Sequence, residues 1–181
     1  MQQKNKLKLF GTIQTMTLSA VFVAISIVCG KYLAINAGPF LRFSFENLPV
    51  VLSGIMFGPI IGAVVGGTAD LIGALIVYGG DMNIFITLGA MSIGLTSGLI
   101  WKFLPKLPNA VKLLLATFIA HLIGSVIIKS LGLAAYYFAE YNMPVYMVML
   151  WRALNYLIVG SAEYLLLFFI TKNKFFKSKL L

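Results

Sequence analysis

The chain has little charge for its length. Of its 181 residues only 10% are charged, against about a quarter in an ordinary soluble domain, and 60% are hydrophobic. The mean hydropathy of +0.97 agrees with this balance. These values exclude a typical soluble domain and indicate an integral membrane protein. The apolar runs are continuous and do not alternate with polar residues, so we expect membrane-spanning helices and not a membrane barrel.

Cysteine and histidine are almost absent. The single cysteine, Cys29, excludes an internal disulfide and lies in an apolar run, where we interpret it as a packing residue. The single histidine, His121, argues against a metal site and favours a hydrogen bond between helices. The phosphate-binding pattern G-x-x-x-x-G-K-[ST] is also absent, so we expect no ATPase activity in this chain, no cofactor and no metal.

The long apolar runs predict six helices. A helix needs about 20 apolar residues to cross a membrane, and one run is too long for a single crossing. Gly58-Pro59 divides that run, because glycine favours a turn and proline favours the first position of a helix. The chain is then a single domain, 1–181, with helices expected over residues 13–35, 47–57, 59–79, 84–104, 110–138 and 145–171.

Lysine placement predicts the orientation of these helices. With six helices, ten of the fourteen basic residues fall on one side of the membrane, and this side is cytoplasmic by the positive-inside rule. Both chain ends, 1–11 and 172–181, are then cytoplasmic and basic. The ten residues are Lys4, Lys6, Lys8, Lys102, Lys106, Lys112, Lys172, Lys174, Lys177 and Lys179.

The helix expected over 47–57 is short. Eleven residues extend about 16 Å, roughly half a bilayer. The preceding segment must therefore enter the outer leaflet as a re-entrant loop, and irregular backbone at that depth is tolerated only if it is buried in protein or lines a cavity. This segment offers a cation, two aromatic rings, a carboxylate and an amide, a composition typical of a small-molecule site. These candidate ligand contacts are Arg42, Phe43, Phe45, Glu46 and Asn47.

Asp70 is the strongest candidate outside this segment. It follows Pro59 by eleven residues, which places a carboxylate near the middle of the membrane, where an unpaired charge is costly. Lys129 is either its partner or a ligand contact. Trp151 can equally be an interfacial aromatic residue, and Arg152 can extend to lipid headgroups. The other candidate ligand contacts are Tyr78, Asn83, Trp151, Arg152 and Asn155.

Small residues recur at helical spacing. They form the pattern Ala20-x-x-x-Ala24 and the segments "GAVVGG" and "GAMSIGLTSG". Small residues four positions apart allow helices to approach closely, so each pattern favours internal packing and is weak evidence for an external partner.

The segment "FENLPVVLSGIMFGPIIGAVVGGTADLIGAL" resembles the substrate-binding S components of energy-coupling-factor (ECF) vitamin transporters, most of all the folate type. The resemblance implies an outward-facing vitamin pocket under the segment between the first two helices. It also implies a prokaryotic cell-membrane location, a transmembrane coupling subunit and two cytosolic ATPases as partners, and no nucleic-acid partner. Ala20 and Ala24 resemble the motif that contacts the coupling subunit. S components for riboflavin and pantothenate share the "FGP" region, so these vitamins stay as alternatives.

The sequence allows two other functions. An intramembrane hydrolase could pair Ser97 or Ser125 with His121, but no strained turn presents either hydroxyl. A secondary transporter often has an inverted repeat with paired broken helices, and in this sequence only one long apolar run is divided by a Gly-Pro break. Both are weaker than the S-component reading.

Overall fold

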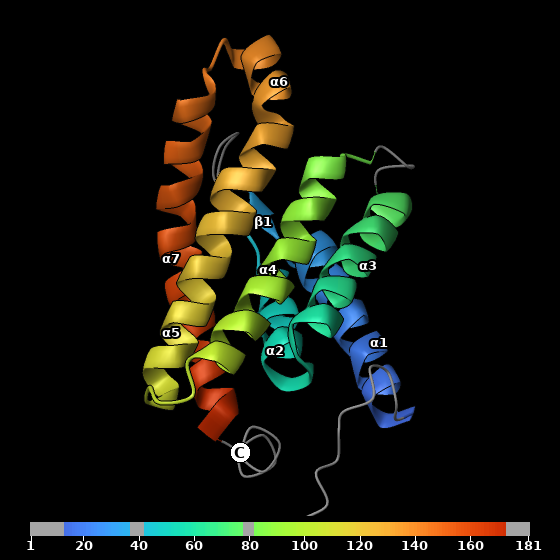
Figure 1. Ribbon diagram of the computed structural model, residues 1–181. Coiled ribbons are helices and arrows are strands. Elements are labelled where there is room, and N and C mark those ends of the chain that lie inside the picture. The colour runs from blue at the N-terminus through green and yellow to red at the C-terminus, as the bar shows by residue number, and fades with distance from the viewer. Residues whose placement is uncertain (1–12, 37–41, 78–81, 173–181) are drawn as a thin grey trace, which may run out of the picture.

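The protein is a bundle of helices with a small two-stranded element (Figure 1). The computed structural model describes residues 13–36, 42–77 and 82–172. The helices are α1 (Ile13–Ile27) with its continuation η1 (Val28–Tyr32), α2 (Asn47–Phe57), α3 (Pro59–Val77), α4 (Ile84–Phe103), α5 (Asn109–Ala120), η2 (His121–Ile128), α6 (Lys129–Tyr141) and α7 (Val145–Lys172). The strands β1 (Ile35–Asn36) and β2 (Arg42–Phe43) pair antiparallel, with Ile35 opposite Phe43.

The predicted apolar runs are helices in the structure. Five helical stretches of the described chain are long and apolar enough to cross a membrane: Ile13–Tyr32, Pro59–Ile76, Ile84–Phe103, Asn109–Ala134 and Val145–Lys172. The sixth helix, α2, has 11 residues and is shorter than a full crossing, as the sequence predicts. The helical fold is therefore confirmed, whereas six membrane crossings and a re-entrant loop stay predictions.

Gly58 separates α2 from α3. Its φ of 97° lies in the left-handed region, which glycine adopts without the steric cost of a Cβ. Its backbone N–H donates to Gly54 O at 3.0 Å and so closes the last turn of α2. Helix α3 then begins at Pro59, the position where proline is favoured. The predicted turn at Gly58-Pro59 is confirmed.

Glycines bring α2, α3 and α4 into backbone contact. A Cβ added to Gly94 of α4 would lie 2.0 Å from the Gly62 carbonyl oxygen of α3. One added to Gly66 would lie 2.2 Å from Ala90 O, and one added to Gly54 would lie 2.4 Å from Gly94 O. Internal packing of the two glycine-rich segments is thus confirmed, and we call these contacts the glycine interface.

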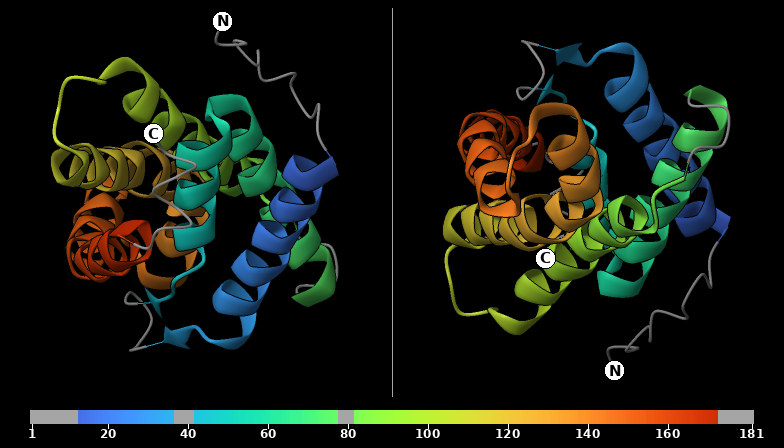
Figure 2. Two further views of the ribbon diagram at one scale, coloured as in Figure 1. Left: turned by 90° about the horizontal axis from the view of Figure 1, so that it is seen from below. Right: turned by 90° about the horizontal axis from the view of Figure 1, so that it is seen from above.

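Helix α4 lies at the centre of the bundle and packs against α2, α3, α5, η2 and α6. Helix α1 contacts α2 and α3 and lies at the edge of the bundle in both end-on views (Figure 2). The start of α1, the α2–α3 turn, the α4–α5 connection and the end of α7 lie at one end of the molecule (Figure 1). The η1 segment, the strands and the α6–α7 hairpin lie toward the other end.

Candidate functional site

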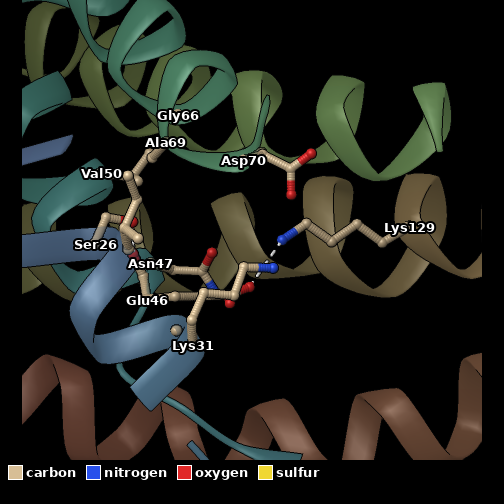
Figure 3. Close-up of a pocket in the computed structure, with 12 residues that line it drawn as sticks. Ser26, Lys31, Glu46, Asn47, Val50, Gly66, Ala69, Asp70 and Lys129 are labelled. Atoms are coloured by element: carbon tan, nitrogen blue, oxygen red, sulfur yellow. Dashed lines mark hydrogen bonds and ion pairs between the residues drawn. The ribbon is translucent and has the colours of Figure 1, made fainter. Parts of the chain in front are cut away.

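A cavity opens between the end of α1, the start of α2, α3, α4 and α6. About 320 Å³ of space, part of it open to solvent, lies between these elements. Figure 3 shows that its polar side chains come from separate helices and point into one space. The lining residues are Ser26, Ile27, Gly30, Lys31, Glu46, Asn47, Val50, Gly66, Ala69, Asp70, Ala90 and Lys129.

An ion pair crosses this cavity. Lys129 Nζ donates to Glu46 Oε1 at 3.2 Å, and the Lys129 side chain is only 5% exposed. Arg42 Nη2 lies 3.8 Å from the other carboxylate oxygen, Glu46 Oε2, and also donates to Gly30 O. A buried cation requires such a partner, because leaving it unpaired in a low-dielectric interior is costly. Glu46 therefore links α6 to the segment between η1 and α2.

Asp70 lines the cavity from α3. Its Oδ2 accepts a hydrogen bond from Thr87 Oγ1 of α4 at 2.7 Å. Figure 3 shows the Asp70 carboxylate pointing toward the space in which the Lys129 amine ends. The sequence left the partner of Lys129 open, and the structure pairs it with Glu46. Thr87 was missed, since an intrahelical threonine ordinarily bonds its own helix and gives no signal of a contact across helices.

Asn47 contributes a hydrogen-bond donor. The residue is 2% exposed and lines the cavity, and its Nδ2 has no hydrogen-bond partner among the described residues. Buried amide donors are ordinarily paired, so an unpaired donor beside a cavity is available to a ligand acceptor. The backbone before it is held by side chains: Ser26 Oγ donates to Glu46 O at 2.6 Å, and Ser44 Oγ accepts from Glu46 N at 3.2 Å.

The charges around the cavity do not balance. Among the described residues, Lys31 and Lys129 line it, and Arg42, which is not part of the lining, pairs with Glu46, which makes three cations against two carboxylates, Glu46 and Asp70. The Lys31 stem packs on α3, because a Cβ on Gly73 would lie 2.8 Å from Lys31 Cε. An excess of positive charge in a partly desolvated site favours an anionic ligand.

Four of the twelve predicted ligand contacts line the cavity: Glu46, Asn47, Asp70 and Lys129. Others lie around it and are not among its lining residues. Asn155 is 5% exposed and donates from Nδ2 to Arg42 O at 2.9 Å, which links α7 to β2. Phe43 is half-buried in β2, and Phe45 is exposed. Tyr78 and the nearby acid Asp81 lie outside the described residues.

The remaining predicted contacts have structural partners. Asn83 caps α4, accepting from Phe85 N at 3.0 Å and donating to Gly132 O at 2.7 Å. Arg152 donates from Nε to Ser125 O at 2.7 Å. Trp151 is 36% exposed on α7, as an interfacial residue would be. None of the three belongs to the lining of the cavity.

A second polar cluster lies deeper, between α5–η2 and α7. His121 Nε2 lies 2.5 Å from Glu163 Oε2, and the side chains are 2% and 0% exposed. His121 Nδ1 is 3.3 Å from Ser125 Oγ. The predicted role of His121 as a hydrogen-bonding residue between helices is confirmed. Among the described residues, no group of three or more His, Cys, Asp or Glu side chains could hold a metal ion.

The chain is similar to several known proteins. The family profile "ECF transporter, substrate-specific component" matches residues 14–174. The "Folate transporter FolT" of Clostridium novyi (strain NT) is 36% identical over 64 residues, which are 35% of this chain and 37% of that protein. The "Uncharacterized protein MG098 homolog" of Mycoplasma pneumoniae (strain ATCC 29342 / M129 / Subtype 1) is 32% identical over 90 residues, 49% of this chain and 19% of that protein. The matched segments thus span well under half of either relative.

The fold is also that of a solved structure. A crystal structure of FolT bound with folic acid aligns with a TM-score of 0.72 and 22% identity, covering 90% of this chain and 96% of that chain. At this identity the similarity establishes the shared fold. The family match covers nearly the whole described chain and describes a transporter component, not an enzyme. The protein therefore belongs to the substrate-specific components of ECF transporters.

Proposed function

We propose that this protein is a folate-type S component that binds folate in the cavity described above. The cavity itself carries the proposal, because it combines an anionic acceptor, a free amide donor and an excess of positive charge. The similarity to the FolT of Clostridium novyi and the shared fold with folic-acid-bound FolT support folate over other vitamins.

The chemistry of folate fits these groups. The pyrimidine edge of pterin presents adjacent N–H donors, which a carboxylate accepts, and Asp70 is the carboxylate held in place by Thr87. Asn47 Nδ2 can donate to a ring acceptor. The glutamyl carboxylates suit Lys31, Lys129 and Arg42. Flat pterin can also stack on an aromatic side chain, and Phe43, Phe45, Tyr78 and Trp151 remain our candidates for that contact.

We further propose that the bundle crosses a prokaryotic cell membrane six times, with both ends in the cytoplasm and the cavity facing outward. Lys102 and Lys106 belong to the end of α4 and the connection to α5, and Lys172 ends α7. These elements lie at the same end as the start of α1 (Figure 1). Positive charge collected at one end supports a cytoplasmic placement of that end.

Delivery of the vitamin requires partners in this proposal. The protein docks on a transmembrane coupling subunit that carries two cytosolic ATPases. Ala20 and Ala24 of α1 support α1 as the docking helix, because both are exposed and lie one turn apart. Small exposed side chains at this spacing allow a second helix to approach closely.

The test is ligand identification on purified protein. Mass spectrometry of ligand retained by the detergent-solubilised chain, followed by calorimetric titration, should identify a folate. Riboflavin and pantothenate should give no heat at the same concentrations. Uptake of labelled folate by cells should require co-expressed coupling subunit and ATPases. Recovery of riboflavin or pantothenate would overturn the choice of vitamin, and uptake without ATPases would overturn the S-component mechanism.

Asp70→Asn should weaken folate binding about ten- to a hundredfold. The amide keeps the shape of the side chain but loses the charge, and a hydrogen bond to a charged group is worth roughly 1.5–3 kcal/mol. Lys106→Ala, in the exposed α4–α5 connection, is the matched control and should not change the dissociation constant. Equal constants for the two variants would remove Asp70 from the ligand site.

A further inference from the structure

Lys129 begins α6 immediately after a wide helical turn. The backbone N–H of Lys129 donates to Gly124 O, five residues earlier. In an α-helix that N–H would donate to Ser125 O, four residues earlier. The segment η2 (His121–Ile128) is therefore π-helical, and such segments are rare and frequently occur at functional sites.

Arg152 of α7 donates to Ser125 O, the carbonyl oxygen that would accept the Lys129 N–H in an α-helix. The distance from Arg152 Nε to Ser125 O is 2.7 Å. This bond stabilises the wide turn. Ser125 O does not accept the Lys129 N–H, which donates to Gly124 O, and Arg152 supplies a donor in its place. Removing one residue from the turn would rotate every later position by about 100°, so Lys129 would leave the cavity wall.

A stacked series of side chains holds Arg152 in place. Its guanidinium lies over the Tyr156 ring, 5.5 Å from the centroid. The Tyr156 ring in turn stacks on His121, with centroids 4.7 Å apart and planes at 24°. Glu163 fixes the His121 ring, because its Oε2 lies 2.5 Å from His121 Nε2. Residues of α7 therefore contact two residues of η2, the first, His121, and the fifth, Ser125.

We propose that Glu163, His121 and Arg152 are positioning residues that maintain the π-helical turn of η2 and thereby direct Lys129 into the cavity. None of the three lines the cavity, so their effect on a ligand is transmitted through Lys129. The part of the proposal that concerns ligand affinity rests on the proposed function, whereas the placement of Lys129 does not.

The double variant His121→Leu/Glu163→Met separates positioning from folding. Apolar replacement of both members of a buried hydrogen-bonded pair can be nearly neutral for stability, whereas removal of one partner leaves a buried polar group unsatisfied. We expect this variant to fold and to bind folic acid at least tenfold more weakly. Adding this double variant to Lys129→Met should weaken folic acid binding little further, because the effects of substitutions that act through the same group are not additive.

A thiol at position 129 provides a readout that needs no ligand. In a Cys29→Ser background, Lys129→Cys should react with a small charged methanethiosulfonate reagent through the cavity mouth. Adding His121→Leu/Glu163→Met should slow this reaction at least tenfold. The control is Ala69→Cys, a cavity position on α3, whose rate should not change.

Arg152→Met is a second variant, which leaves the His121–Glu163 pair intact, and it should slow labelling at position 129 in the same way. Unchanged labelling at position 129 in the folded variants would overturn the proposal, whatever the affinity. If the wild-type protein binds no folic acid while labelling at 129 responds as expected, the proposed function fails and the positioning role stands.

Discussion

Lys129→Met is expected to weaken folate binding by about a hundredfold or more. The change removes one of three cations around the cavity and leaves Glu46 without its 3.2 Å partner. In the proposed complex Lys129 also pairs with a glutamyl carboxylate of folate. Truncating one member of a buried charge pair across a binding interface costs about 2–5 kcal/mol, and each 1.4 kcal/mol is about a factor of ten in affinity. Titration of purified protein with folic acid measures the change.

The melting temperature must be measured on the same sample, because Glu46 then keeps its 3.8 Å contact with Arg42 but loses the shorter one with Lys129, and this loss also destabilises the fold. Lys106→Ala, with the same loss of one positive charge, should bind folic acid as the wild type does. A Lys129→Met protein that melts normally and binds folic acid with unchanged affinity would show that Lys129 pairs with Glu46 and does not contact the ligand.

Gly94→Ala is expected to destabilise the protein by about 3 kcal/mol or more. The new Cβ would lie 2.0 Å from Gly62 O, and the contacting atom is backbone that cannot move without separating α3 from α4. Overpacking of this kind ordinarily costs about 1–3 kcal/mol, and a rigid backbone neighbour places the variant at or above the upper limit. A lower melting temperature and less folded protein on size-exclusion chromatography are the readouts.

Gly160→Ala is the control for this change. A Cβ there would meet His121 Cδ2 at 3.4 Å, an ordinary contact, and alanine favours a helix over glycine by about 1 kcal/mol. Its melting temperature should therefore equal or exceed that of the wild type. Equal stability of the two alanine variants would contradict a tight glycine interface.

Much of the fold was predictable because a membrane helix is encoded locally. Continuous apolar runs must be helical to satisfy their backbone groups, and Gly58-Pro59 divides the one run that is too long. The structure extends the fifth run to Tyr141 and ends α1 at Ile27, before the turn of η1. Helix ends differ from prediction because tertiary contacts, such as Arg42 to Gly30 O, decide where the regular pattern stops.

The candidate site was predictable only in part. Asp70 and Glu46 were identifiable because a carboxylate in an apolar run is costly and needs a reason. The partner of Lys129 was not identifiable, since Glu46 lies 83 positions away in the chain. Nor could the sequence separate Asn83 and Arg152, which bond to backbone, from residues that line the cavity.

The sequence by itself determined the membrane class, the helical runs, the division at Gly58 and the family resemblance, because each depends on composition or on short-range pattern. The tertiary structure alone decided which polar side chains share the cavity and which bond to their neighbours. That decision depends on the rotation of each helix about its axis. In η2 a single π-helical turn shifts this rotation and directs Lys129 toward Glu46, and no local pattern in the sequence encodes that turn.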